Sequence, residues 1–249
     1  MSTPPDAFPL AAPPFAGASR RAPIDAAFAW LRLGWLLFTG NPGVWIGIAV
    51  LFIVAMLGLS IVPLVGQLAA NLLLPVFIAG LLTACRRTAD GEMPAIADLF
   101  AGFRQNTGPL ILLGVLFMLG MFFIGAIVFV LAGGSLASAL AVGRPTGFGL
   151  AFGGLMVAAL LWLVLSAPLL MAICFAPALV SFHAMAPLPA LKASFSACLK
   201  NAPVFLVFGL LTLVLAFFAA LPAGLGFLVL GPVLAGATYA AYRDIFIGA

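Results

Sequence analysis

The fold of this chain is decided by residues 24–87, which read IDAAFAWLRLGWLLFTGNPGVWIGIAVLFIVAMLGLSIVPLVGQLAANLLLPVFIAGLLTACRR. Asp25 can cap a first amphipathic helix over residues 24–38, and Asn41-Pro42 ends that helix and starts the next. Two apolar runs follow, 43–62 and 66–85, each close to the ~20 residues that cross ~30 Å of hydrocarbon. We therefore predict a helix on the membrane surface followed by a transmembrane hairpin.

The composition places the whole chain in a membrane. Of its 249 residues, 65% are hydrophobic and 6% are charged, and the mean hydropathy is +1.32, whereas about a quarter of a soluble domain is charged. The net charge of +4 does not indicate nucleic-acid binding, since basic residues collect beside apolar spans for topological reasons. The three cysteines lack metal-type spacing. We predict one membrane domain, residues 24–249, with no metal and no cofactor.

The first 23 residues differ from the rest and contain six prolines. We predict a disordered, Pro-rich cytoplasmic tail, and a Pro-rich segment that binds a partner is the alternative.

Downstream, the same order of a surface helix and a hairpin recurs. Residues 96–103 and 191–200 have the spacing of two more amphipathic surface helices. Further spans are predicted at 110–132, 203–221 and 225–242, and a Gly/Ser/Ala-rich loop reaching Gly147 lies on the far side. The expected fold is an all-α polytopic bundle of six transmembrane helices and three cytoplasmic interfacial helices.

Charge decides how the remaining apolar run, 148–183, crosses the membrane. If it is one span, bent at Pro168 and Pro177, nine of the ten basic residues share one side and only Arg144 is opposite. If it is two short spans, the division falls to six against four. Because positive residues collect on the cytoplasmic side, we predict a single bent span, with both termini cytoplasmic.

An internal echo suggests three repeated helix-plus-hairpin modules. Each predicted surface helix ends in Asn with Pro shortly after, at Asn41, Asn106 and Asn201. In two return helices, a Pro-Val pair precedes an arginine by the same eleven residues, ending at Arg86 and Arg243. The middle return helix departs from this pattern. Convergence among helix-ending residues is the alternative to duplication.

Several motifs resemble a known family: Gly34-Trp35, Asn41-Pro42-Gly43-Val44-Trp45-Ile46, Leu74-Pro75-Val76-Phe77, Ala84-Cys85-Arg86 and Leu99-Phe100-Ala101-Gly102-Phe103. Over residues 28–245 the chain resembles uncharacterised proteobacterial inner-membrane proteins. A looser resemblance, to the membrane domain attached to some bacterial glycerophosphodiester phosphodiesterases, is carried by Phe175-Ala176-Pro177-Ala178-Leu179-Val180, Ala190-Leu191-Lys192-Ala193-Ser194-Phe195 and Lys200-Asn201. Both imply a bacterial inner membrane protein, and neither implies an activity.

Two groups of polar residues are candidate contacts. A ring of cations at the cytoplasmic boundary could bind anionic lipids, although such residues can also serve topology alone: Arg86, Arg87, Arg104, Lys192, Lys200 and Arg243. Inside the membrane, Gln67, Asn71 and Ser166 could bond a neighbouring helix or touch a polar ligand. Gln67 and Asn71 share one helix face. The single histidine, His183, is expected to be a surface residue and not a catalyst.

The six acidic residues all fall in predicted cytoplasmic segments. Proton relays and ion-coupled carriers place ionisable groups within spans, and no predicted span has one in its interior. We therefore expect no enzymatic activity and no catalytic residues, and favour a scaffold or accessory protein that contacts membrane lipids, a membrane-protein partner or another copy of itself. The alternative is a carrier or channel for an apolar or lipid-like solute.

Overall fold

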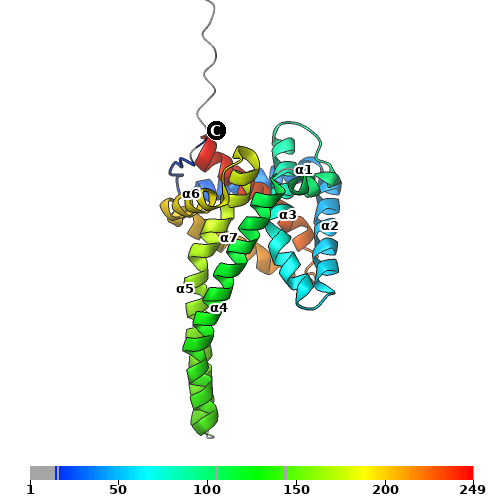
Figure 1. Cartoon of the computed structure of the whole chain (residues 1–249). Coiled ribbons are helices and arrows are strands. Elements are labelled where there is room, and N and C mark those ends of the chain that lie inside the picture. The colour runs from blue at the N-terminus through cyan, green and yellow to red at the C-terminus, as the bar shows by residue number, and fades with distance from the viewer. Residues whose placement is uncertain (1–14, 16, 105, 143–144, 249) are drawn as a thin grey trace, which may run out of the picture.

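The computed structural model describes residues 15, 17–104, 106–142 and 145–248. Throughout these ranges the regular structure is helical and there is no strand, which confirms the predicted all-α class (Figure 1). In chain order the elements are α1 (Ala26–Gly40), α2 (Pro42–Ser60), α3 (Val65–Ala89), the 3₁₀ helix η1 (Ile96–Phe103), α4 (Thr107–Val142), α5 (Pro145–His183), α6 (Pro187–Lys200), α7 (Ala202–Ala220), α8 (Phe227–Tyr242) and the π-helical turn η2 (Arg243–Ile247).

Five of the described helices are long and apolar enough to cross a membrane: α2, α3, α4, α5 and α7. The sixth predicted span, 225–242, is not among them. Residues 221–226 form turns, with positive φ at Ala223 and Gly224, so that α8 begins only at Phe227. Its 16 residues span about 24 Å at 1.5 Å per residue, short of the ~30 Å of a hydrocarbon core.

Helices α4 and α5 form an arm that extends past the other hairpins (Figure 1). Their 36 and 39 residues correspond to about 54 and 58 Å. The predicted loop between the spans was wrong, because α4 is helical as far as Val142 and α5 from Pro145. That stretch is rich in alanine, the best helix former. The prediction that 148–183 is one element was confirmed.

Helix α5 is continuous through Pro168 and Pro177, and a side chain from α6 bonds to its backbone between them. The backbone N–H of Phe175 donates to Ser194 Oγ at 3.0 Å, and that hydroxyl donates to the carbonyl of Met171 at 2.7 Å. The Ser194 hydroxyl therefore bridges the N–H of Phe175 and the C=O four residues before it, and it joins α6 to α5.

Helix α1 lies against α8 at a crossing made by two glycines. A Cβ on Gly34 would lie 2.2 Å from the carbonyl oxygen of Val233, and one on Gly236 would lie 2.9 Å from the Cα of Gly34. Only glycine permits backbones this close. The buried face of α1 is Ala26, Ala27, Trp30, Gly34 and Phe38.

The three short helices α1, η1 and α6 occur near the predicted ranges. On α1, Phe28 and Trp35 are 58% and 50% exposed, whereas Phe38 is 6% exposed. Helix α6 buries small residues, Ala190, Ser194, Ala197 and Cys198. The second surface helix is 3₁₀ and not α.

The buried core lies mainly at the end of the molecule that carries these short helices. Half of the α3 span is buried, against at most 17% of any other span. Helix α3 is therefore the central element, and the remaining spans present apolar side chains outward.

Most of the predicted disordered tail, residues 1–23, lies outside the described residues. Its described part packs on the body of the protein. The Phe15 ring stacks on His183 with centroids 4.1 Å apart, and the backbone N–H of Arg20 donates to the carbonyl of Ile245 at 2.9 Å.

Candidate functional site

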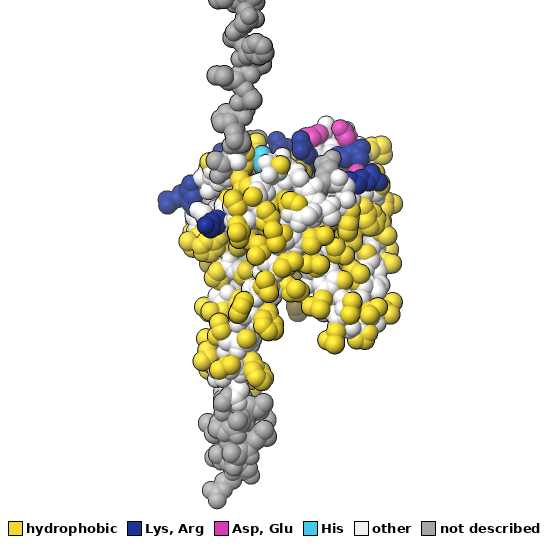
Figure 2. Space-filling view, viewed as in Figure 1, with side chains coloured by type: hydrophobic (Ala, Val, Ile, Leu, Met, Phe, Trp, Pro, Cys, Tyr) yellow, Lys and Arg dark blue, Asp and Glu magenta, His cyan; other side chains and the backbone are white. Residues whose placement is uncertain are grey.

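Charged side chains gather toward one end of the face drawn in Figure 2, and the surface beyond them is apolar. Each of the six predicted cations can now be placed by what it contacts. They separate into those already engaged by the protein and those that face solvent.

Arg87 is engaged in structure. Its Nε donates to Glu92 at 2.9 Å and its guanidinium donates to Asp98 at 2.8 Å. The other oxygen of Asp98 accepts the backbone N–H of Ala95 at 2.7 Å, so that the ion pair ties the end of α3 to η1. Asp98 is 9% exposed. The charge of Arg87 is therefore balanced by two carboxylates of the protein, and two of its five N–H donors are used.

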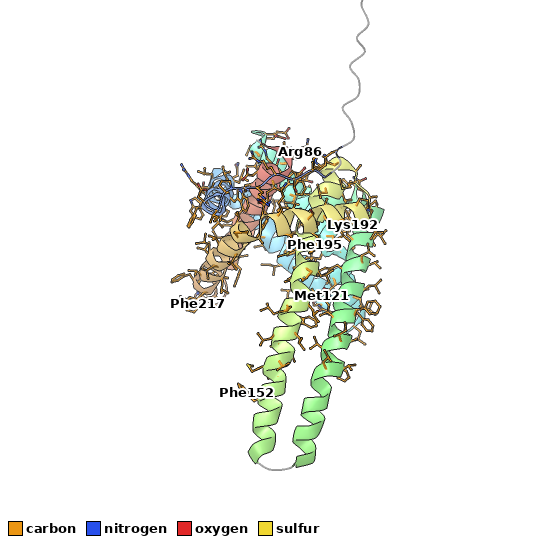
Figure 3. The ribbon with its side chains drawn as sticks, turned by 90° about the vertical axis from the view of Figure 1, so that its left-hand side faces the viewer. Arg86, Met121, Phe152, Lys192, Phe195 and Phe217 are labelled. Atoms are coloured by element: carbon orange, nitrogen blue, oxygen red, sulfur yellow. The ribbon has the colours of Figure 1, made fainter. Side chains whose placement is uncertain are left out.

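Lys200 is also engaged, because its ammonium donates to the carbonyl of Ser19. Arg104 and Lys192 are exposed, and Lys192 lies on α6 (Figure 3). Exposed cations of this kind are common beside apolar helices, where they help to set membrane topology.

The N-terminal segment is held by a buried amide that was predicted only as a helix end. Asn201, 2% exposed, accepts the N–H of Ala22 at 2.8 Å and donates to the carbonyls of Arg20 at 3.0 Å and Ala197 at 2.9 Å. Arg20 in turn forms an ion pair with Asp244. The described start and end of the chain are therefore joined at one end of the molecule.

Asp244 also accepts the indole N–H of the buried Trp30 at 2.9 Å. Sequence spacing could not have revealed this contact, because the two residues are 214 positions apart.

Arg86 and Arg243 remain, and they line one hollow of about 260 Å³, together with Asp90, Phe182, His183, Tyr239, Tyr242 and Ile247. Arg86 lies over the ring of Phe182, 5.3 Å from its centroid. Its Nε is 3.8 Å from Asp90 in a solvent-exposed pair. His183 and the Tyr242 hydroxyl form a hydrogen bond of 2.5 Å. The hollow is therefore lined by two guanidinium groups and by the rings of Phe182, Tyr239 and Tyr242, which form its aromatic floor.

Next to this hollow lies a larger, mainly apolar groove of about 780 Å³ between α1, the end of α3 and α8. Leu33, Leu36, Leu37 and Met93 line its apolar side. Tyr239 and Arg243 line both the groove and the hollow, so that the two spaces are neighbours across these side chains.

The three predicted intramembrane polar residues do not come together around either space. The Asn71 amide donates to the carbonyl of Gln67 in its own helix at 2.8 Å, and Ser166 donates to Leu163 at 3.2 Å. Gln67 is exposed. Their proposed contacts with a neighbouring helix or ligand stay predictions.

The aromatic floor was missed by the sequence analysis, although a signal existed. Tyr239, Tyr242 and Arg243 fall at i, i+3 and i+4, and therefore share a helix face. The equal Pro-Val spacing to Arg86 and Arg243 had also marked these two arginines as equivalent, and the structure brings both to one hollow.

Comparison with known proteins gives one relative. The chain is 32% identical over 197 residues to a probable inner membrane protein of Burkholderia thailandensis, an alignment that covers 76% of this chain and 73% of that protein. No family model and no solved structure matches the chain. The match confirms the predicted multi-span inner-membrane class, while the looser resemblance to the phosphodiesterase membrane domain stays a prediction.

Proposed function

This chain belongs to the family of the probable inner membrane protein of Burkholderia thailandensis, and we propose that it serves there as a non-catalytic scaffold or accessory protein that binds membrane lipid at its charged end. The observation that carries this proposal is that four acidic residues at this end are engaged by other side chains. Asp98 and Glu92 hold Arg87, Asp90 faces Arg86, and Asp244 binds Arg20 and Trp30. Carboxylates held in this way serve the architecture, whereas a general base must be free to take a proton.

The proposed topology has six spans, with both termini in the cytoplasm. Helix α7 starts beside Asn201 at the end where residues 20–22 are held, and α8 returns to the same end, since Asp244 pairs with Arg20 there. We therefore treat α7 and α8 as a short hairpin that crosses a locally thinned bilayer. The concentration of cations at this end supports a cytoplasmic orientation. A cysteine engineered at position 192 should react with an impermeant maleimide only after the inner membrane is opened, and reaction in intact spheroplasts would reverse the topology.

The proposed three-module organisation is supported by where the return helices converge. In each of three successive units a short helix precedes a hairpin: α1 with α2–α3, η1 with α4–α5, and α6 with α7–α8. The last turns of the three return helices meet at the hollow, with Arg86 from α3, His183 from α5 and Tyr242 from α8. Equivalent helices that meet at one place are expected of an internal repeat that frames a central site.

The scaffold proposal is tested by purification from native membranes in mild detergent, followed by protein identification and lipid analysis. We expect a bound lipid, a membrane-protein partner or a second copy of the chain. Recovery of only a free, lipid-free monomer would refute the proposal.

The groove supports a second candidate, a carrier for an apolar or lipid-like solute, because its apolar lining of about 780 Å³ is within the size range of small-molecule sites. Proteoliposomes with a fluorescent phospholipid in both leaflets distinguish the two. Loss of more than the outer-leaflet signal on adding an impermeant quencher would favour a carrier, and protection of the inner leaflet would favour the scaffold.

A further inference from the structure

We propose that the hollow between Arg86 and Arg243 and the adjoining groove form one site for a single anionic phospholipid, with its phosphodiester at the two arginines and an acyl chain in the groove. This inference rests on the proposed role in lipid binding and gives it a location and a ligand class.

The charges that face the hollow suit a phosphodiester. Arg86 belongs to α3, Asp90 directly follows that helix, and Arg243 belongs to η2. Two positive groups and one negative group leave a formal charge of one positive unit, which complements the single negative charge of a phosphodiester. The Arg86–Asp90 pair is long, at 3.8 Å, and both side chains are more than half exposed. Arg243 forms no ion pair with any residue that the structure describes.

The arginine of α3 is held in place before any ligand arrives. Arg86 lies over Phe182. Phe182 packs edge-on against Tyr239 with centroids 6.2 Å apart, and in a tilted arrangement against Tyr242 with centroids 5.6 Å apart. A guanidinium stacked on a ring loses less conformational freedom when it binds. Its planar set of donors also matches the oxygens of a phosphate.

The adjoining groove identifies the anion as a lipid headgroup and not a soluble phosphate. It continues from Arg243 and Tyr239 along α1, where Leu33 and Leu36 are 49% and 53% exposed. A polar hollow joined to an apolar channel has the amphipathic form of a phospholipid. The carboxylates at the groove, Glu92 and Asp244, are already paired with Arg87 and Arg20, so they add little repulsion.

The other cations at this end provide a matched control. Arg104 and Lys192 are exposed cations that line neither space. The double variants Arg86→Gln/Arg243→Gln and Arg104→Gln/Lys192→Gln therefore remove the same charge from the same end of the protein, and only the first removes it from the hollow.

The experiment is native mass spectrometry of the delipidated full chain titrated with phosphatidylglycerol or with zwitterionic phosphatidylethanolamine. We expect wild type to prefer phosphatidylglycerol with one tight site. Loss of two arginine contacts should weaken that site by about 30-fold, while the Arg104/Lys192 variant should stay within about two-fold of wild type. Equal weakening in both double variants would mean diffuse attraction to the membrane surface, and would overturn the site but not the proposed function. Absence of bound lipid in wild type would count against both.

The acyl-chain part of the site is tested separately. Ala89 is exposed and lines the groove at the end of α3, so that Ala89→Trp should obstruct the groove there. We expect this variant to lose phosphatidylglycerol binding while keeping the wild-type thermal unfolding temperature. Glycerophosphoglycerol, the same headgroup without chains, should compete at least ten-fold more weakly than the lipid does, because it gains nothing from the groove. Equal competition, or unchanged binding by Ala89→Trp, would overturn the assignment of the groove.

Discussion

Replacement of Asn201 by alanine should loosen the N-terminal segment from the body of the protein. Two of the three hydrogen bonds of this buried amide reach that segment, from Ala22 N–H at 2.8 Å and to Arg20 C=O at 3.0 Å. The third, to Ala197, stays at the end of α6. At a net value of about 1 kcal/mol for each bond, Asn201→Ala lowers the free energy that holds the segment by about 2 kcal/mol. The opened population should therefore rise by about 30-fold.

Trypsin reports this opening directly, because Arg20 and Arg21 are cleavage sites within the held segment. When opening and closing are fast relative to cleavage, the rate follows the opened population. We expect cleavage at these sites to be about 30-fold faster in Asn201→Ala than in wild type. Asn71→Ala is the matched control, since the Asn71 amide bonds only to Gln67 of its own helix. Equal cleavage rates in Asn201→Ala and wild type would refute the reasoning.

Two further substitutions test how the helices are joined, each by thermal unfolding in detergent micelles. A Cβ at Gly34 would lie 2.2 Å from the Val233 carbonyl oxygen, so Gly34→Leu should destabilise the protein by about 1–3 kcal/mol or more. Gly43→Leu is the control, because nothing lies within 4 Å of the added Cβ, and it should leave the stability unchanged. Equal unfolding temperatures for the two variants would contradict the close crossing of α1 and α8. Ser194→Ala removes the hydroxyl that bridges Phe175 and Met171 of α5 and should lower the free energy of unfolding by about 1–3 kcal/mol. Ser196 is exposed, so Ser196→Ala should leave that free energy unchanged. An unchanged unfolding temperature in Ser194→Ala would show that the bridge contributes nothing to stability.

The order of short and long helices could be predicted because its signals are local. Pro42 and Pro203 mark the start of a new helix because proline is favoured in the first helical turn, and α1 and α6 end just before, at Gly40 and Lys200. Neither Asn41 nor Asn201 is left-handed, with φ of −148° and −110°. The lengths of α4 and α8 could not be predicted in the same way. An apolar helix that crosses a bilayer can continue beyond it with the same residues. The turn at residues 222–224 was signalled by its proline and glycine, but its extension to Gly226, which shortens α8, was not.

The sequence could predict which cations gather at the candidate site, but it could not predict which partners each of them contacts. Sequence reasoning placed Arg86, Arg87 and Arg243 at one boundary, but it could not distinguish an arginine held by carboxylates from one that faces a hollow. That distinction depends on partners brought together by the fold. Arg87 meets Asp98 only because η1 folds back against α3, and Asp244 is engaged only because residues 20 and 30 reach the end of the chain.

Arg86 and Arg243 follow their Pro-Val pairs at the same spacing, and the structure brings both arginines to one hollow. Each Pro-Val pair lies within a helix, Pro75 in α3 and Pro232 in α8. Eleven residues at 1.5 Å carry each helix about 16 Å further, and both arginines line the same hollow. In the middle return helix the equivalent position is Leu179, which is fully buried, and α5 instead reaches the hollow one turn later with Phe182 and His183. A third arginine at residue 179 would have had to be buried without water, at high cost. Helix α5, which departs from the pattern, therefore lines the hollow with Phe182 and His183, where α3 and η2 contribute arginines.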